Sequence, residues 1–129
     1  MKKYKIELSE KQMTLISQCI EDISRFASGQ PELSYTIQEM LKELPFDEQI
    51  RRRDVVENKL NEIKKILLPD LIGDGSKSYN GSTFIGNTYQ IYRTILHRLA
   101  LDNNYNNVYS STTLPSGDLG TIKIEKIKD

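Results

Sequence analysis

Residues 9–29 carry an apolar stripe with the period of an α-helix, between a clear start and a clear stop. Ser9 followed by Gln12 is a capping-box pattern, in which each side chain satisfies a backbone N–H of the first turn. Gly29 and Pro31 are typical of a helix end. At 100° per residue the apolar residues share one side: Met13, Leu15, Ile16, Cys19, Ile20, Ile23, Phe26 and Ala27. The polar residues Gln18, Glu21, Asp22 and Arg25 lie opposite, so the sequence predicts that this helix buries its apolar side.

Three further helices are expected from the same periodicity. A short one ends at Pro45 and includes Ile37, Met40, Leu41 and Leu44. A longer one starts at Asp47, reaches about Leu68, and carries the seam Val56, Leu60, Ile63 and Leu67. The last begins at the capping pattern of Asn87 and Gln90 and runs to about Leu101. Four apolar residues of the long helix lie off this seam and predict a second packing surface, such as a subunit contact: Ile50, Val55, Ile66 and Leu68.

The two terminal segments show the alternation of half-buried strands. Residues 3–8 alternate apolar and charged side chains, and Ile122 and Ile124 alternate with Lys123 and Glu125. We expect these segments to pair as a two-stranded ribbon that the helices cover, since a lone ribbon is only marginally stable. The predicted fold is therefore α+β and mainly α, with three main helices, a short helix and this ribbon. The 129 residues suit a single domain, 1–129.

Composition narrows the function classes. The 18 basic residues equal the 18 acidic ones, so no net field attracts nucleic acid or an anionic membrane. No stretch of about 18 apolar residues could span a bilayer, and the N-terminal residues do not resemble a signal peptide. Cys19 and His97 are the only residues of their types, too few for a disulfide or a four-ligand zinc site. We expect a cytoplasmic protein without metal or cofactor.

The run Arg51-Arg52-Arg53 allows two interpretations. Guanidinium groups suit phosphate, but consecutive residues spread around a helix, and Asp47 and Glu48 precede the run at ion-pair spacing. A solvated, salt-bridged helix is favoured over a nucleic-acid site.

Tyr89, Arg93 and His97 form one stripe along the last helix. They could hold an anionic or aromatic ligand by charge, stacking and imidazole hydrogen bonds. The alternative is that Arg93 pairs with a carboxylate and His97 is a satisfied boundary residue. The polar loop 73–86 is either a tether or an anion-binding loop that leads into a helix N-terminus. The loop 102–120 is expected to lie ordered against the helices, anchored by its tyrosines.

Several short motifs resemble a group of small, largely uncharacterised bacteriophage and prophage accessory proteins of Bacteroides-type gut bacteria. They are the segments 24–30 (SRFASGQ), 107–111 (NVYSS) and 122–125 (IKIE), with a Tyr-x-x-Tyr-Arg helix at 89–93. The resemblance implies a phage accessory protein that acts in the cytoplasm of the infected bacterial host. One role open to such proteins is to neutralise host-defence components, including nucleotide-derived signals.

The leading hypothesis is a non-enzymatic anti-defence protein that binds and sequesters a small phosphate-bearing nucleotide derivative. Its predicted ligand-binding residues are Tyr89, Arg93, His97, Arg25, Gln30, Asn107, Tyr109 and Ser110. A homo-oligomer is expected, because small domains often build enclosed sites at subunit boundaries. The alternative is a protein–protein interaction module that inhibits a host enzyme or assists phage replication. A third hypothesis is a nucleotide-processing enzyme with His97 as acid and base.

Overall fold

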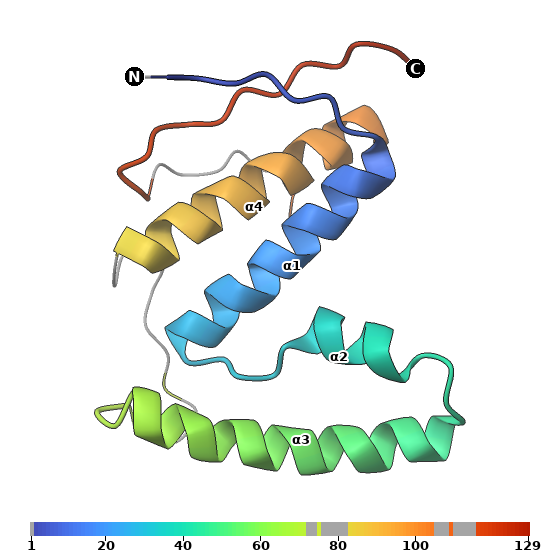
Figure 1. Ribbon diagram of the computed structural model, residues 1–129, viewed down its shortest axis with the longest axis vertical. Coiled ribbons are helices and arrows are strands. Elements are labelled where there is room, and N and C mark those ends of the chain that lie inside the picture. The colour runs from blue at the N-terminus through green and yellow to red at the C-terminus, as the bar shows by residue number, and fades with distance from the viewer. Residues whose placement is uncertain (1, 72–74, 76–82, 105–108, 110–115) are drawn as a thin grey trace.

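The computed structural model describes residues 2–71, 75, 83–104, 109 and 116–129, and the chain forms four helices there (Figure 1). They are α1 (Glu10–Ser28), α2 (Ser34–Leu41), α3 (Phe46–Leu67) and α4 (Thr83–Asp102). Helices α1 and α4 pack along each other, α2 packs on α1, and α3 runs across one end of the molecule. The four predicted helices are confirmed. Helix α4 begins at Thr83, four residues before the predicted start, so the end of the predicted loop 73–86 is helical.

The predicted two-stranded ribbon is wrong: the described residues contain no strand, and the fold is all-α. The C-terminal segment instead forms hydrogen bonds with side chains of α4. The backbone N–H groups of Ser116 and Gly117 donate to Gln90 Oε1 at 3.2 and 3.1 Å, and Gln90 Nε2 donates to the Gly120 carbonyl at 3.3 Å. Leu119 N–H donates to Asn87 Oδ1 at 3.2 Å. The segment that leads into the predicted strand is therefore fixed to a helix.

The apolar residues of the two alternating terminal segments differ in how far they are buried. Ile122 and Ile124 pack against the core, so their apolar side is used, although on a helix pair rather than on a strand. Tyr4 and Ile6 remain 82% and 76% exposed. The alternation of apolar and charged residues at the N-terminus therefore does not correspond to a buried face within one copy of the chain.

The core follows one face of α4. Its buried cluster consists of Tyr92, Ile95, Leu96 and Leu99. Met13 and Ile20 of α1 pack against this cluster from the side. Most of the apolar burial in the described residues thus comes from α4.

Helix α1 is rotated from its predicted orientation: Met13 and Ile20, at one edge of the predicted apolar side, pack against the core, but the centre of that side is exposed. Leu15, Ile16 and Ile23 are 53%, 38% and 47% exposed, and Cys19 is exposed as well. The residues that α1 buries are polar, namely Ser17, Glu21, Asp22, Ser24 and Ser28. The prediction that the apolar side of α1 faces the core is therefore wrong for the centre of that side.

Small hydroxyl side chains explain how α1 can bury this side. The hydroxyls of Ser17 and Ser28 donate to carbonyls of their own helix, at 3.0 Å to Thr14 and 2.8 Å to Arg25. Ser24 Oγ donates across to the Ile85 carbonyl of α4 at 3.5 Å. A hydroxyl that is satisfied in this way can be buried at little cost. Short side chains on α1 also let its backbone approach α4 closely.

Asp22 connects α1 to α2. Helix α2 is preceded by Leu33, which has a positive φ of 46° and makes no side-chain cap. The Asp22 carboxylate, 5% exposed, replaces that cap from the neighbouring helix. It accepts the backbone N–H groups of Tyr35 at 3.2 Å and Thr36 at 2.7 Å, and the Thr36 hydroxyl at 2.7 Å. A carboxylate on the solvent side of the predicted helix is thus a tertiary helix cap.

Helix α3 is fixed at its C-terminal end. Lys64 is buried, and its ammonium donates to the Gly75 carbonyl at 2.7 Å. Gly29, which ends α1 with a φ of 105°, lies beside this lysine, so the ends of α1 and α3 meet here. Of the predicted second surface of α3, Ile50, Val55 and Ile66 are exposed and Leu68 is half-buried.

Candidate functional site

The predicted stripe on α4 forms a cluster with residue 109. Arg93 is 9% exposed, and its guanidinium lies over two aromatic rings, 5.9 Å from the centroid of Tyr89 and 5.1 Å from that of Tyr109. Cation–π contacts of this kind are strengthened by burial. The imidazole Nδ1 of His97 is 2.9 Å from the Tyr109 carbonyl, so this nitrogen carries the hydrogen and donates. Helix α4 therefore binds both the ring and the backbone of Tyr109.

Glu21 is the central residue that the sequence did not reveal. It is 6% exposed and receives the Tyr109 hydroxyl, which lies 2.9 and 2.7 Å from its two carboxylate oxygens. Arg25, one turn further along α1, donates to the same carboxylate at 2.7 Å. We call these residues together the Tyr109 cluster: Glu21, Arg25, Tyr89, Tyr92, Arg93, His97 and Tyr109. The spacing of Glu21 and Arg25 signals an ion pair, but no local pattern shows that Glu21 is buried while the Arg25 side chain stays 54% exposed.

The structure brings together five of the eight predicted ligand-binding residues: Arg25, Tyr89, Arg93, His97 and Tyr109. Gln30 follows the end of α1, where its backbone N–H donates to the Arg25 carbonyl at 2.9 Å and its side chain is exposed. Gln30 thus contacts the cluster through the backbone of Arg25, and its side chain is directed to solvent. Asn107 and Ser110 lie outside the described residues.

The electrostatics of the cluster are those of an internal network. Burial, the hydrogen bond to Glu21 and the charge of that carboxylate together raise the pKa of Tyr109. Burial, followed by the Glu21 charge, raises the pKa of Tyr92. The cluster thus already contains an anion beside Arg25. A phosphate placed there would meet the charge of Glu21.

Replacement of Tyr109 by phenylalanine should lower the free energy of unfolding at neutral pH by about 1–3 kcal/mol, because the buried Glu21 carboxylate loses a donor. The folded pKa of Tyr109 lies above the unfolded value of about 10, so its stabilisation is present below that pH and is lost as the pH rises further. The wild-type chain should therefore lose stability more steeply than Tyr109→Phe above about pH 10. Urea unfolding across pH 7–11 measures both effects. Tyr4→Phe, at an exposed position, is the control, and equal pH slopes for wild type and Tyr109→Phe would contradict the assignment.

The main pocket found among the described residues lies elsewhere. It has a volume of about 660 Å³ and lies between the start of α1, the end of α4 and the two terminal segments. Its lining includes Glu7, Glu10, Arg98, Asp102 and Lys126, and none of the eight predicted residues. Arg98 pairs with Asp102 at 2.9 Å, and Lys126 pairs with Asp129 at 2.8 Å. These paired charges of both signs do not form an anion cradle.

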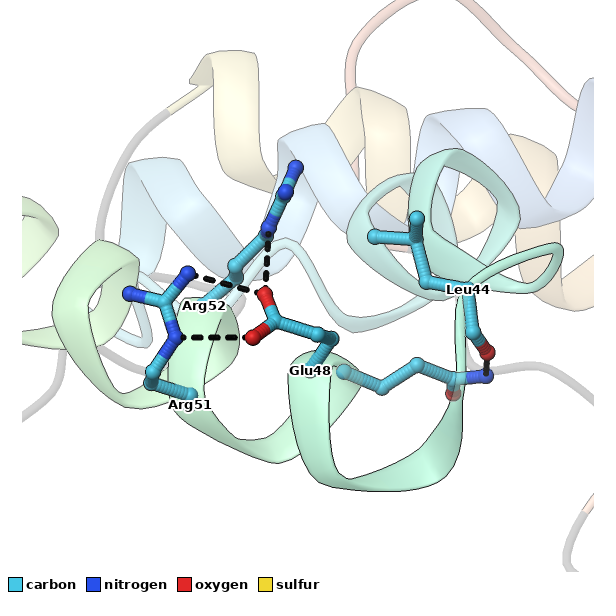
Figure 2. A network of polar contacts seen from close by, with 5 residues as sticks. Leu44, Glu48, Arg51 and Arg52 are labelled. Atoms are coloured by element: carbon cyan, nitrogen blue, oxygen red, sulfur yellow. Dashed lines mark hydrogen bonds and ion pairs between the residues drawn. The ribbon is translucent and has the colours of Figure 1, made fainter.

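The arginine run on α3 matches the salt-bridged interpretation. Figure 2 shows the side chains of Arg51 and Arg52 converging on the Glu48 carboxylate, at 2.8 and 3.2 Å. Hydrogen bonds from Arg51, and then from Arg52, lower the pKa of Glu48. Glu48 thus serves both arginines, whereas the predicted partner Asp47 does not appear among the ion pairs of the described residues. These contacts lie on an exposed face and build no phosphate site.

Within the described ranges, no group of three or more His, Cys, Asp or Glu residues could hold a metal ion. No helix in that part of the chain is long and apolar enough to cross a membrane. Comparison of the chain with protein families, with curated proteins and with solved structures finds no match.

Proposed function

We propose that this protein acts without catalysis, by binding another protein chain through the exposed apolar side of α1. The observation that carries the proposal is the orientation of α1. Its polar residues Ser17, Glu21, Asp22, Ser24 and Ser28 are buried within the chain, whereas Leu15, Ile16, Cys19 and Ile23 are exposed. We call these four residues the α1 apolar face.

The α1 apolar face has the geometry of a helix-binding surface. Its members follow one another at one, three and four residues, which keeps them on one side of the helix. Exposed apolar side chains that occur singly are ordinary, but a contiguous group on a regular element is typical of an interaction site. Apolar side chains at this spacing allow a helix to dock its apolar face into a hydrophobic groove of a partner.

The other candidate sites in the described residues are less suited to binding a partner protein. Ion pairs within single helices engage Arg51 and Arg52 of the arginine run and Arg98 at the pocket. The Tyr109 cluster joins α1 to α4 through buried contacts, and its main visible effect is to position residue 109. Protein binding by the α1 apolar face therefore fits the geometry best.

The test is capture of a partner with a matched pair of variants. Tagged wild type, Ile16→Glu/Ile23→Glu and Ile6→Glu/Leu119→Glu are incubated with extract of infected bacterial cells, and bound proteins are identified by mass spectrometry. The control pair introduces the same charges at exposed apolar positions of the terminal segments. We expect the wild type and the control to retain the same partner and the α1 variant to lose at least nine-tenths of it. Equal capture by all three would reject the α1 apolar face.

A second candidate function is sequestration of a phosphate-bearing nucleotide derivative. The convergence of five predicted residues in the Tyr109 cluster favours it, because two guanidinium groups and two tyrosine rings meet there. The ligand would have to displace Glu21 from Arg25. Calorimetric titration with cyclic and ADP-ribose-derived nucleotides tests this function. Binding that is lost in Arg93→Ala supports it, and no binding heat, or unchanged binding in that variant, rejects it.

A further inference from the structure

We infer that the partner of the α1 apolar face is a second copy of this chain, so that two α1 helices pair across a two-fold axis near Cys19. This inference rests on the proposed function and names the partner for the same surface. Two observations support a second copy over a different protein: the seam on α1 and the charge balance. The exposed area of the chain leaves room for the interface.

The exposed area of the chain is larger than that of a compact globular protein of its mass. The chain exposes 9657 Å², whereas a monomeric globular protein of 14.9 kDa exposes about 7,000 Å². The extended terminal segments contribute to the surplus, as do the apolar residues of α1 and α3.

The seam on α1 is complementary to itself. Ile16, Cys19, Ile23 and Phe26 follow at three, four and three residues, the spacing of a two-helix seam. If the axis passes near Cys19 and the helices run antiparallel, Ile16 of one copy meets Ile23 of the other, and this contact occurs twice. An isologous interface requires that kind of reciprocity. Antiparallel helices also place opposite dipole ends together.

Charge does not oppose the association of two copies. The chain has 18 basic and 18 acidic residues, so two copies do not repel each other through net charge. The α1 apolar face itself contains no charged residue, which gives it no preference for a strongly charged partner. A neutral, apolar and self-complementary helix face is best covered by an identical face.

Sedimentation velocity of the purified full chain between 1 and 100 µM tests the inference. We expect the wild type and Ile6→Glu/Leu119→Glu to sediment as dimers at the upper concentration. Ile16→Glu/Ile23→Glu should stay monomeric, with its dissociation constant raised at least 100-fold and its helical circular dichroism kept. A monomeric wild type at 100 µM, or a dimer that survives the two glutamates, would overturn the inference.

Cross-linking keeps the test decisive if the double variant fails to fold. Cys19 is the only cysteine, so a short bis-maleimide should join two wild-type chains covalently and leave Cys19→Ser unlinked. A wild-type dimer that resists this cross-link would show that the interface lies elsewhere. The two proposals fail differently: a monomeric wild type that still captures another protein through Ile16 and Ile23 removes the second copy and keeps the proposed function.

Discussion

Alanine at position 22 should detach the start of α2 from α1 and lower the free energy of unfolding by roughly 2–3 kcal/mol, since hydrogen bonds to charged groups and helix caps contribute on this scale. Asp22 is 5% exposed and accepts three hydrogen bonds from Tyr35 and Thr36. Leu33 offers no cap of its own, so these donors lose their protein acceptor in the variant. Urea unfolding measures the loss, and hydrogen exchange at Tyr35 and Thr36 locates it.

Two further variants separate this cap from a general charge effect. Asp22→Asn keeps one acceptor oxygen and loses the charge, so its loss of stability should be intermediate. Asp54→Ala removes an exposed carboxylate of α3 and should change stability by no more than about 0.5 kcal/mol. If Asp22→Ala and Asp54→Ala are equally stable, Asp22 is not the cap of α2.

The second large effect is a contrast between two leucines. Leu96→Ala should cost about 2–5 kcal/mol, because Leu96 is 7% exposed within the core cluster and its truncation leaves a cavity. Leu15→Ala removes the same atoms from a side chain that is 53% exposed, so in the monomer it should cost less than about 1 kcal/mol.

Urea unfolding at low micromolar concentration measures both leucine variants with little contribution from self-association. The apolar stripe of residues 9–29, taken by itself, predicts a large loss for Leu15→Ala as well. Comparable losses in the two variants would mean that α1 buries its apolar side after all. The orientation of α1 would then be wrong.

The helices could be predicted from sequence because their signals are local. Ser9 and Gln12 form the expected capping box, with hydrogen bonds of 2.8 and 3.1 Å, and Gly29 ends α1 in the left-handed conformation. Backbone groups at helix ends need partners wherever the helix lies, so these patterns do not depend on tertiary structure. The start of α4 was missed because Thr83–Gly86 looks like the end of a polar loop.

The packing could not be predicted because it depends on residues far apart in the chain. Periodicity shows which residues share a side of α1, but not whether that side meets α4 or a partner. The burial of Ser17, Ser24 and Ser28 has no local signal in the sequence. Ser17 and Ser28 donate to carbonyls of α1 itself, and Ser24 donates across to α4. The sequence places Glu21 on the solvent side of α1, and its burial depends on Tyr109, which lies 88 residues later in the chain.

The prediction of a terminal ribbon is wrong for the same reason, that pairing depends on residues far apart in the chain. Alternation at Ile122 and Ile124 correctly indicates one apolar side, but a strand needs a partner for its backbone. Gln90 and Asn87 of α4 bind the backbone of residues 116–120 instead. In the candidate site, the α4 stripe was readable from spacing alone, whereas the carboxylate that neutralises Arg25 was not.

The reactivity of Cys19 tests the central claim, that the apolar face of α1 points outward and is covered by a second copy. The rate of alkylation by iodoacetamide is measured for wild type and Ile16→Glu/Ile23→Glu from 0.1 to 100 µM protein, with denatured chain as the reference. The account predicts that wild-type Cys19 reacts readily at the lowest concentration and is protected at least tenfold at the highest, while the variant reacts readily throughout. A folded, monomeric variant whose Cys19 stays protected would show that α1 buries its apolar face, and would contradict the account.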